Sequence, residues 1–315
     1  MNSIRSLRDI YSIIKSRINI YNRKFPFKIM KKTVIGYIYS EKKPSKDEKI
    51  FLNLAKKKNI QIIPLSLSEI KDEKKFENKV KECDLVYNSS AEEFSIEFAK
   101  TIEIIGRKVI DSPRAYYYTE DKWIFFLKCR EHKIPVPNTI LLSNNKNIAK
   151  SELKKFNYWP VILKRIEGCQ GEYVARAEDI IEVENIIQKF WKKGSEKLPI
   201  IAQEFINSPS YRVTVIGDKI VQAVKKKHHG WKSTGAWAFR HERFVVDEEL
   251  KKIIKKIIKI SGIKIIGIDL LKKQGKWVVL EINSEPTFGF IEVDRKKLIE
   301  EALNFLETEA IKMQK

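Results

Sequence analysis

The chain has 315 residues, enough for two or three packed domains, and its 43% hydrophobic content argues against wholesale disorder. No apolar run approaches the roughly 20 residues of a membrane span, and the N-terminus lacks a signal-peptide layout. Three scattered cysteines (Cys83, Cys129 and Cys169) offer neither a disulfide framework nor zinc spacing. We therefore expect a cytoplasmic protein. The formal charge of +21 favours contact with phosphates, nucleic acid or carboxylate-rich substrates. Because the lysines are spread along predicted helices, we expect a solvated surface and no nucleic-acid partner.

Residues 1–29 are predicted to be an N-terminal extension. Their apolar residues recur at helical spacing among basic ones and indicate one short amphipathic helix: Ile4, Leu7, Tyr11, Ile14 and Ile18. Such a helix could dock on the body of the protein, touch a membrane surface or mediate dimerisation, and docking is the simplest of the three. Met30 directly precedes the first predicted strand, so translation could begin there.

Residues 30–112 are predicted to form a small α/β domain. Strands alternate with helices, which implies a small parallel sheet. No glycine-rich phosphate loop follows the first strand, which argues against a dinucleotide site. The predicted strands are Thr33–Tyr39, Ile60–Leu65, Asp84–Tyr87 and Val109–Ile110, and the predicted helices are Asp47–Lys58, Phe76–Lys81 and Glu92–Ile105.

Residues 113–202 are predicted to form the next unit. Its first helix, Glu120–His132, has Thr119 or Asp121 as a candidate N-cap, and the prolines of Ile134–Pro137 end it. The other predicted elements are the strands Thr139–Leu142, Trp159–Arg165, Glu172–Ala177 and Pro199–Ile206 and the helices Ile148–Phe156 and Asp179–Lys192.

Residues 203–315 complete the chain as a third unit. A hairpin turned at Gly217–Asp218 is followed by a loop of aromatic, basic and glycine residues, a helix stopped by Gly262, a second hairpin and a final helix. Their predicted ranges are Tyr211–Ile216 and Lys219–Val224 for the first hairpin, His228–Trp237 for the loop, Asp247–Ser261 for the helix, Ile265–Leu271 and Trp277–Asn283 for the second hairpin, and Asp294 to about Ala310 for the final helix.

The second of these hairpins is apolar except at Asp269, Glu281 and Asn283. Buried acidic groups are costly unless they are paired or bind a metal. A three-residue loop, Lys273–Gly275, is expected to set Asp269 opposite Val279 and to put all three polar residues on one face. A two-residue loop would separate them, unless a bulge intervened. Three oxygen ligands on one rigid face suit Mg²⁺, although an exposed hairpin with ordinary surface acids is the simpler alternative.

Two other stretches are weaker candidates for a nucleotide site. Lys164 ends a strand just before a loop with Gly168 and Gly171, so it could reach a phosphate held under that loop. Taken alone the glycines favour an ordinary turn, and together with the three predicted metal ligands they favour the phosphate role. The segment Gln203–Phe205 ends an apolar strand where adenine could pair with backbone groups, and its alternative is an edge strand entering a loop. Lys122, in the first turn of its helix, is unremarkable by itself.

Taken in order, these stretches resemble the ATP-grasp family, and within it the RimK-like carboxylate–amine ligases that add α-L-glutamate. The motifs that carry the resemblance are DSPRAYYYTEDK, IPVPNT, VILKRIEGCQGEYV, QEFI, YRVTVIGDKIVQA, IGIDLL and VLEINSEP. They keep the family's order and spacing from about Val109 to Gly289. The resemblance implies an α/β fold in which a small N-terminal parallel α/β domain (30–112) precedes a two-subdomain ATP grasp (113–202 and 203–315).

The resemblance also implies roles for individual residues. Arg212 is expected to face the transferred phosphoryl group or the substrate carboxylate. Lys232 is also expected to be catalytic, because it stands where the family usually has an Arg in the loop before the long helix. Two positions depart from the family's pattern: Ser210 stands where a ribose-binding Asp is common, and Thr234 stands where an Asn is usual. The expected ATP contacts are Lys122, Lys164, Gly168, Gln170, Gly171, Gln203, Glu204, Phe205 and Ser210, and the expected ligands of two Mg²⁺ ions are Asp269, Glu281 and Asn283.

The function that the resemblance implies is an ATP-dependent carboxylate–amine ligase working through an acylphosphate. We expect ATP and Mg²⁺ as cofactors, with Mn²⁺ able to substitute, and an acidic small molecule, coenzyme or protein tail as the acceptor of glutamate or another amino acid. A homo-oligomer is left open. The alternatives are an ATP-grasp kinase that phosphorylates a hydroxyl, as inositol-phosphate kinases do, and a non-catalytic basic protein that binds nucleic acid or ribosomes.

Overall fold

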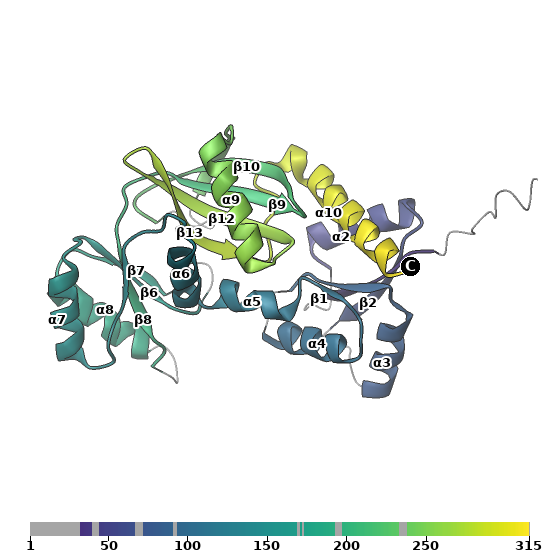
Figure 1. Cartoon of the computed structure of the whole chain (residues 1–315), viewed down its shortest axis with the longest axis horizontal. Coiled ribbons are helices and arrows are strands. Elements are labelled where there is room, and N and C mark those ends of the chain that lie inside the picture. The colour runs from purple at the N-terminus through teal and green to yellow at the C-terminus, as the bar shows by residue number, and fades with distance from the viewer. Residues whose placement is uncertain are drawn as a thin grey trace, which may run out of the picture. The chain divides into compact units, whose positions relative to one another are not determined.

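Alternating strands and helices begin the part of the chain whose structure is described. A computed structural model describes residues 32–39, 44–66, 72–90, 93–168, 171, 173–192, 197–232 and 238–314. The helix predicted within residues 1–29 lies outside these ranges. Residues 33–315 cluster as one unit, whose helices and strands are labelled in Figure 1.

The first sheet is parallel, as predicted, with its strands in the order β2-β1-β3-β4. Central strand β1 sets Ile35 beside Ile62 on one side and beside Leu85 on the other. Helix α2 begins with a capping box, in which Ser45 and Glu48 each accept a hydrogen bond from the other's backbone N–H. The elements are β1 (Val34–Tyr39), α2 (Lys46–Lys57), β2 (Gln61–Ser66), α3 (Glu73–Glu82), β3 (Leu85–Asn88), α4 (Glu93–Ile104) and β4 (Val109–Ile110).

The last helix, α10 (Glu292–Met313), returns to this first sheet. It lies beside α2 (Figure 1), and its apolar side chains, Leu303 and Leu306 among them, are buried in one cluster with Ile35 and Leu54. Helix α10 is longer at both ends than the predicted helix. The two ends of the described chain therefore share one hydrophobic core.

The predicted helix Glu120–His132 is present as α6 (Lys122–Glu131). A helix that the sequence analysis does not predict, α5 (Pro113–Glu120), ends directly before it. At Asp121 the backbone is extended, and the carboxylate accepts hydrogen bonds of 2.8 and 2.9 Å from two backbone N–H groups in the first turn of α6. Asp121 is therefore the N-cap, and it places Lys122 at the start of a new helix.

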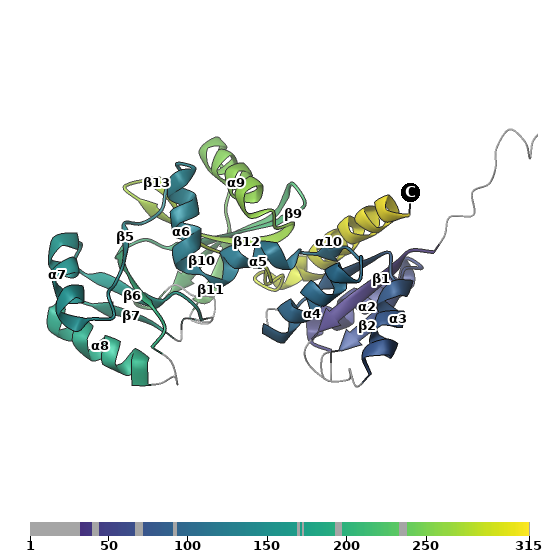
Figure 2. The same ribbon diagram turned by 60° about the horizontal axis from the view of Figure 1, so that its bottom comes forward.

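The second sheet is antiparallel, with its strands in the order β5-β8-β6-β7. Two helices, α7 and α8, lie beside it in Figure 2 and bury Leu153 and Ile187 against Leu163 and Ala202. The elements are β5 (Thr139–Leu141), α7 (Lys146–Phe156), β6 (Val161–Arg165), β7 (Val174–Ala177), α8 (Ile180–Lys192) and β8 (Ile200–Glu204).

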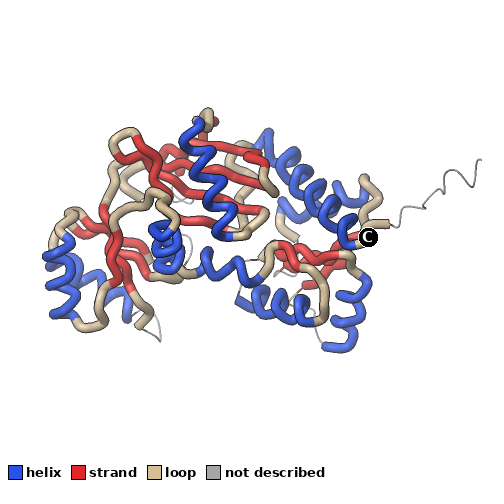
Figure 3. Tube along the Cα trace, viewed as in Figure 1, coloured by secondary structure: helices blue, strands red, loops and turns tan. Residues whose placement is uncertain are grey.

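The third sheet is also antiparallel, with its strands in the order β11-β10-β9-β12-β13. Helix α9 crosses one face (Figure 3) and buries Ile253 and Ile257 in a core that also contains Phe125 of α6. Asp247 caps the start of α9, and Gly262 ends it in a left-handed conformation. The elements are β9 (Ser210–Ile216), β10 (Lys219–His228), β11 (Ala238–Arg243), α9 (Glu248–Ser261), β12 (Ile265–Lys273) and β13 (Lys276–Asn283).

Strand β11 corrects the sequence analysis, which predicts no strand between Val224 and the helix at Asp247. Its charged residues give no apolar alternation, but they pair with the lysines of the neighbouring strand: Glu242 lies 2.9 Å from Lys227. The predicted unit limits at 113 and 203 stay predictions. Among the helices of the described ranges, none has both the length and the apolar character that crossing a membrane requires.

Candidate active site

The hairpin of β12 and β13 brings the three predicted metal ligands onto one face, but by a different route from the predicted one. The turn has two residues, Gln274 and Gly275, both with positive φ (50° and 81°), and Lys273 pairs with Lys276. This is the geometry of a two-residue hairpin turn whose twist matches that of the strands. The predicted three-residue loop and the pairing of Asp269 with Val279 are therefore wrong.

A β-bulge restores the expected face. Val279 pairs with Leu270, and the next pair is Glu281 with Asp269, so Leu280 is the extra residue. Asn283 then pairs with Gly267, two positions along the same face. The bulge thus aligns both carboxylates and the amide, and it leaves the core side of β12 and β13 apolar.

Asp269 is the most strongly constrained of the three. Its Oδ1 accepts a hydrogen bond from Lys226 Nζ at 2.8 Å and lies 3.0 Å from Arg212 Nε, and both cations are buried. Burial alone would raise the pKa of Asp269, but the charges of Arg212 and Lys226 hold that pKa below its usual value. Asp269 is therefore ionised across the neutral pH range. Asn283 Nδ2 lies 3.4 Å from its other oxygen, Oδ2.

The side-chain oxygens of Asp269, Glu281 and Asn283 fit a hard divalent cation. Carboxylate and amide oxygens are the ligands that Mg²⁺ prefers, and it usually takes one or two carboxylates and fills its other positions with water and phosphate. Within the described ranges there is no group of three or more His, Cys, Asp and Glu that could hold a metal ion. The candidate set is thus two carboxylates and one amide, which suits an ion shared with a phosphate substrate.

Gly267 gives Arg212 the space that it needs. A Cβ built on Gly267 would overlap the guanidinium of Arg212, which lies across β12 at this point. Arg212 is 9% exposed, and its Nη1 has no hydrogen-bond partner among the described residues. The arginine therefore presents an unused donor on the face that carries the candidate metal ligands.

A second set of polar residues comes from the second sheet and from α6. Lys164 Nζ on β6 donates to Gln203 Oε1 on β8 at 2.9 Å, and Lys122 Nζ donates to the carbonyl of Gly168 at 2.8 Å. Burial lowers the pKa of Lys164, and the negative charges of Glu281 and Asp269 partly offset this effect. The charges of both acids thus act on Lys164 across the two predicted halves of the site.

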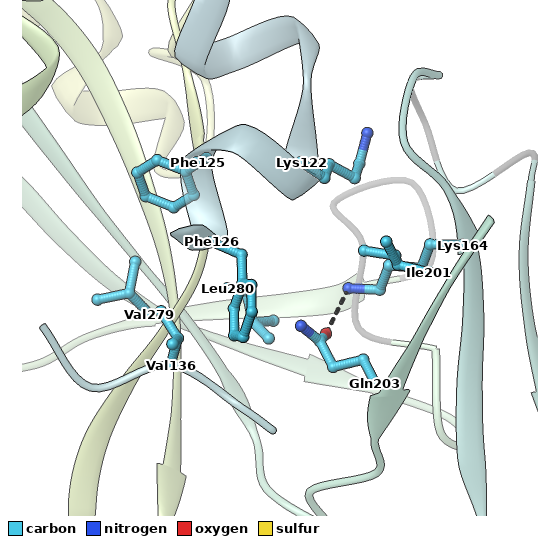
Figure 4. A pocket seen from close by; sticks show the side chains of 9 residues that line it. All are labelled: Lys122, Phe125, Phe126, Val136, Lys164, Ile201, Gln203, Val279 and Leu280. Atoms are coloured by element: carbon cyan, nitrogen blue, oxygen red, sulfur yellow. Dashed lines mark hydrogen bonds between the residues drawn. The ribbon is translucent and has the colours of Figure 1, made fainter. Parts of the chain in front are cut away.

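A small pocket, open to solvent, is lined by residues from both of these parts. Figure 4 shows Lys164 bonded to Gln203 at one side, and the aromatic and aliphatic side chains from α6, Val136 and β13 at the other. Leu280 reaches this pocket because it is the bulge residue. An apolar slot with a lysine and an amide at its edge could take a planar base and an adjoining phosphate chain. The lining residues are Lys122, Phe125, Phe126, Val136, Lys164, Ile201, Gln203, Val279 and Leu280.

The remaining predicted nucleotide contacts differ in how they are placed. The N–H of Phe205 already donates to Pro160 O at 3.2 Å, and its ring lies 4.4 Å from the Arg176 guanidinium. Ser210 is buried opposite Lys226. Gly168 and Gly171 have φ of 125° and 73°, which glycine adopts most readily. Gln170 and Thr234 lie outside the described residues, and Lys232 Nζ lies 5.6 Å from the Trp231 ring centre.

Sequence reasoning missed Lys226. By sequence alone Lys226 looks like its neighbours in the basic run Lys225–Lys227, but in β10 alternate residues face opposite sides of the sheet. Lys226 is 1% exposed and bonds Asp269, whereas Lys227 is partly exposed. The signal that could have found it is the period of two within a strand whose other inward residues are Gln222 and Val224.

The fold is that of the ATP-grasp enzymes. A RimK-domain ATP-grasp protein from Sphaerobacter thermophilus superposes with a TM-score of 0.69 at 15% identity, and the match covers 87% of this chain and 99% of that one. The predicted fold, a small parallel α/β domain followed by an ATP grasp, is thereby confirmed. ATP-grasp ligases use ATP with Mg²⁺.

The sequence places the chain within that class. The profile of the RimK-like ATP-grasp domain matches residues 119–307, and the chain belongs to this family. The α-aminoadipate–LysW ligase LysX of Saccharolobus solfataricus is 28% identical over 59% of this chain and 69% of its own length. The coenzyme γ-F420-2:α-L-glutamate ligase of Methanocaldococcus jannaschii is 26% identical over 67% of this chain and 74% of its own. The predicted RimK-like family is confirmed.

Proposed function

We propose that this protein is an ATP-dependent carboxylate–amine ligase that forms an amide bond through an acylphosphate. The observation that carries the proposal is the convergence of Asp269, Glu281 and Asn283 on one sheet face, with Arg212 and Lys226 beside them and Lys164 across the pocket. The relatives' names support a ligase over the alternative kinase and the alternative non-catalytic protein.

The chain's own residues have distinct roles in this proposal. Lys122 and Lys164 bind the phosphates of ATP, and Gln203, with the backbone of Glu204, orients the nucleotide in the apolar slot. Asp269, Glu281 and Asn283 hold Mg²⁺, which neutralises phosphate charge when it is bound. Arg212 uses its free Nη1 to orient the substrate carboxylate or the transferred phosphoryl group.

The reaction is balanced without a protein nucleophile. A carboxylate oxygen attacks the γ-phosphorus, and ADP leaves. The amine then attacks the acyl carbon, phosphate leaves, and the nitrogen releases a proton. Positioning and charge stabilisation supply the catalysis, and the loop at Gly168–Gly171 would exclude the water that hydrolyses an acylphosphate.

The finer parts of the proposal concern partners and ions. We assign two Mg²⁺ ions, replaceable by Mn²⁺, and a cytoplasmic location. Glutamate is the first amine to test, because two RimK-like relatives are named as ligases of glutamate or of a related acidic amino acid. The acceptor is an acidic small molecule, coenzyme or protein tail, which the formal charge of +21 would attract.

Hydroxylamine trapping tests the reaction class. With ATP, Mg²⁺, a panel of carboxylic acids and hydroxylamine, we expect one hydroxamate for each ADP released, because hydroxylamine attacks acylphosphates readily. With glutamate in place of hydroxylamine, mass spectrometry should find an amide. A stable phosphorylated product formed from a hydroxyl acceptor, without amide, would instead identify a kinase.

A further inference from the structure

The carboxylate of Glu204 joins three separate segments of the chain. It accepts hydrogen bonds from the backbone N of Asn138 at 3.1 Å and from Asn138 Nδ2 at 3.0 Å. Lys273 Nζ donates to both of its oxygens, at 2.8 and 2.7 Å. Glu204 ends β8 of the second sheet, Asn138 precedes β5, and Lys273 borders the hairpin turn of the third sheet.

The same three segments form walls of the nucleotide pocket. Gln203 lines the pocket and directly precedes Glu204, and Val136 lines it two residues before Asn138. Val279 and Leu280 line it from the strand that follows the Lys273 turn. A further link between these walls is the hydrogen bond of 2.8 Å from Val279 N to Pro135 O. One carboxylate therefore connects three of the segments that line the pocket, and α6 and β6 supply the rest of the lining.

The two halves of the ion pair differ in exposure. The Glu204 side chain is 7% exposed, and Asn138 holds it within its own sheet. The Lys273 side chain is 41% exposed and comes from the other sheet. An ion pair with one exposed partner contributes little to stability and can break and re-form readily. Loss of Lys273 would leave the buried carboxylate with its two hydrogen bonds from Asn138.

We propose that the Glu204–Lys273 ion pair acts as a clasp between the two sheets, which holds the nucleotide pocket narrow and slows nucleotide release. Glu204 and Lys273 are then positioning residues: the side chain of Glu204 works between the sheets, whereas its backbone is the group proposed to contact the nucleotide. The inference rests on the proposed function only in taking this pocket as the ATP site.

The rate at which an ADP analogue dissociates tests the clasp. We would load the full chain with mant-ADP and Mg²⁺, chase with excess ADP, and compare wild type with Lys273→Met, which keeps the length of the side chain and removes its charge. We expect dissociation to be about fivefold faster, which corresponds to about 1 kcal/mol. The KM for ATP should rise in parallel, while kcat does not fall.

Matched variants separate a clasp from a general effect of charge or folding. Lys276→Met removes an exposed lysine directly opposite Lys273 in the same turn and should leave dissociation unchanged. Lys273→Arg should restore slow release, and Glu204→Gln should add nothing once Lys273→Met is present. A dissociation rate for Lys273→Met equal to that for Lys276→Met would overturn the clasp. Because the readout is nucleotide release, it remains decisive even if hydroxylamine trapping fails.

Discussion

At the scale of single residues, Asp269 determines the charge balance of the candidate site. One of its oxygens faces two buried cations, Lys226 and Arg212, and Glu281 lies opposite on the next strand. Removing a buried acid from such a group leaves cations unpaired, which typically costs several kcal/mol. Glu281, which is only half-buried, is therefore the better position at which to test metal binding without disturbing the fold.

Glu281→Gln should abolish Mg-ATP turnover, with a loss of about 100-fold or more, because it removes a negative charge that faces the metal. Asp269→Asn should do the same and should also lower the melting temperature. ADP release at saturating Mg²⁺ measures the first effect, and thermal unfolding measures the second. Glu301→Gln, which removes only a surface partner of Lys219, is the control. Wild-type turnover in Glu281→Gln would exclude it as a metal ligand.

At the scale of elements, the sequence predicts the apolar strands and the capped helices well. Gly262 stops α9 as predicted, and Asp247, predicted as the first residue of that helix, is its N-cap. What the sequence does not reveal depends on pairing between elements. The bulge at Leu280 follows from how β13 pairs with β12, and β11 is recognised only by its pairing with β10, where Glu242 forms an ion pair with Lys227.

The candidate site was likewise predictable where local sequence carries the signal, and not where it depends on how the strands pair. Asp269, Glu281 and Asn283 share a face as predicted, although the register that places them there is different. Lys226 could be found only by extending the period of two from Gln222 and Val224, because a lysine within a lysine run appears exposed until the strand and its partners are known. Asp121 was one of two candidate N-caps, but nothing local shows that a second helix ends immediately before it.

Asp111 connects two elements of different sheets and makes their connection sensitive to pH. It follows β4, is buried, and accepts hydrogen bonds from the backbone N of Lys264 (2.5 Å) and Ile265 (3.0 Å), at the start of β12. Burial raises the pKa of Asp111 to about 7, an effect that these N–H groups and the charge of Lys264 only partly offset. The folded protein therefore holds a proton that the unfolded chain releases near pH 4.

The free energy of unfolding should consequently fall as the pH rises from 5 to 7, by about 2 kcal/mol from this group. Above pH 7 the contribution is lost and the dependence levels off. Asp111→Asn should be less stable overall, because an amide cannot accept both hydrogen bonds, and it should lack this slope. Urea unfolding of both proteins at pH 5, 6, 7 and 8 measures the difference. Parallel curves would show that Asp111 does not titrate in this range.

At the scale of the whole molecule, the described site residues all lie between Lys122 and Asn283. A chain that begins at Met30 should therefore keep its ATP turnover, although its solubility or oligomeric state could change. ADP release measures the turnover, and circular dichroism verifies that the shortened chain is folded. A folded chain without turnover would mean that residues 1–29 contribute to the site.

The position of helix α10 has a consequence for synthesis on the ribosome. The strands β1 to β4 emerge early, but one face of their sheet is completed by Leu298, Leu303 and Leu306 of α10, which are made roughly 200 residues later along the chain. At usual rates of translation this delay is on the order of tens of seconds. During that time Ile35 of the sheet, Leu54 of α2 and their neighbours are exposed to solvent in the nascent chain, where a chaperone could bind them. The core of the first sheet is thus completed only once α10 has been made and docks on it.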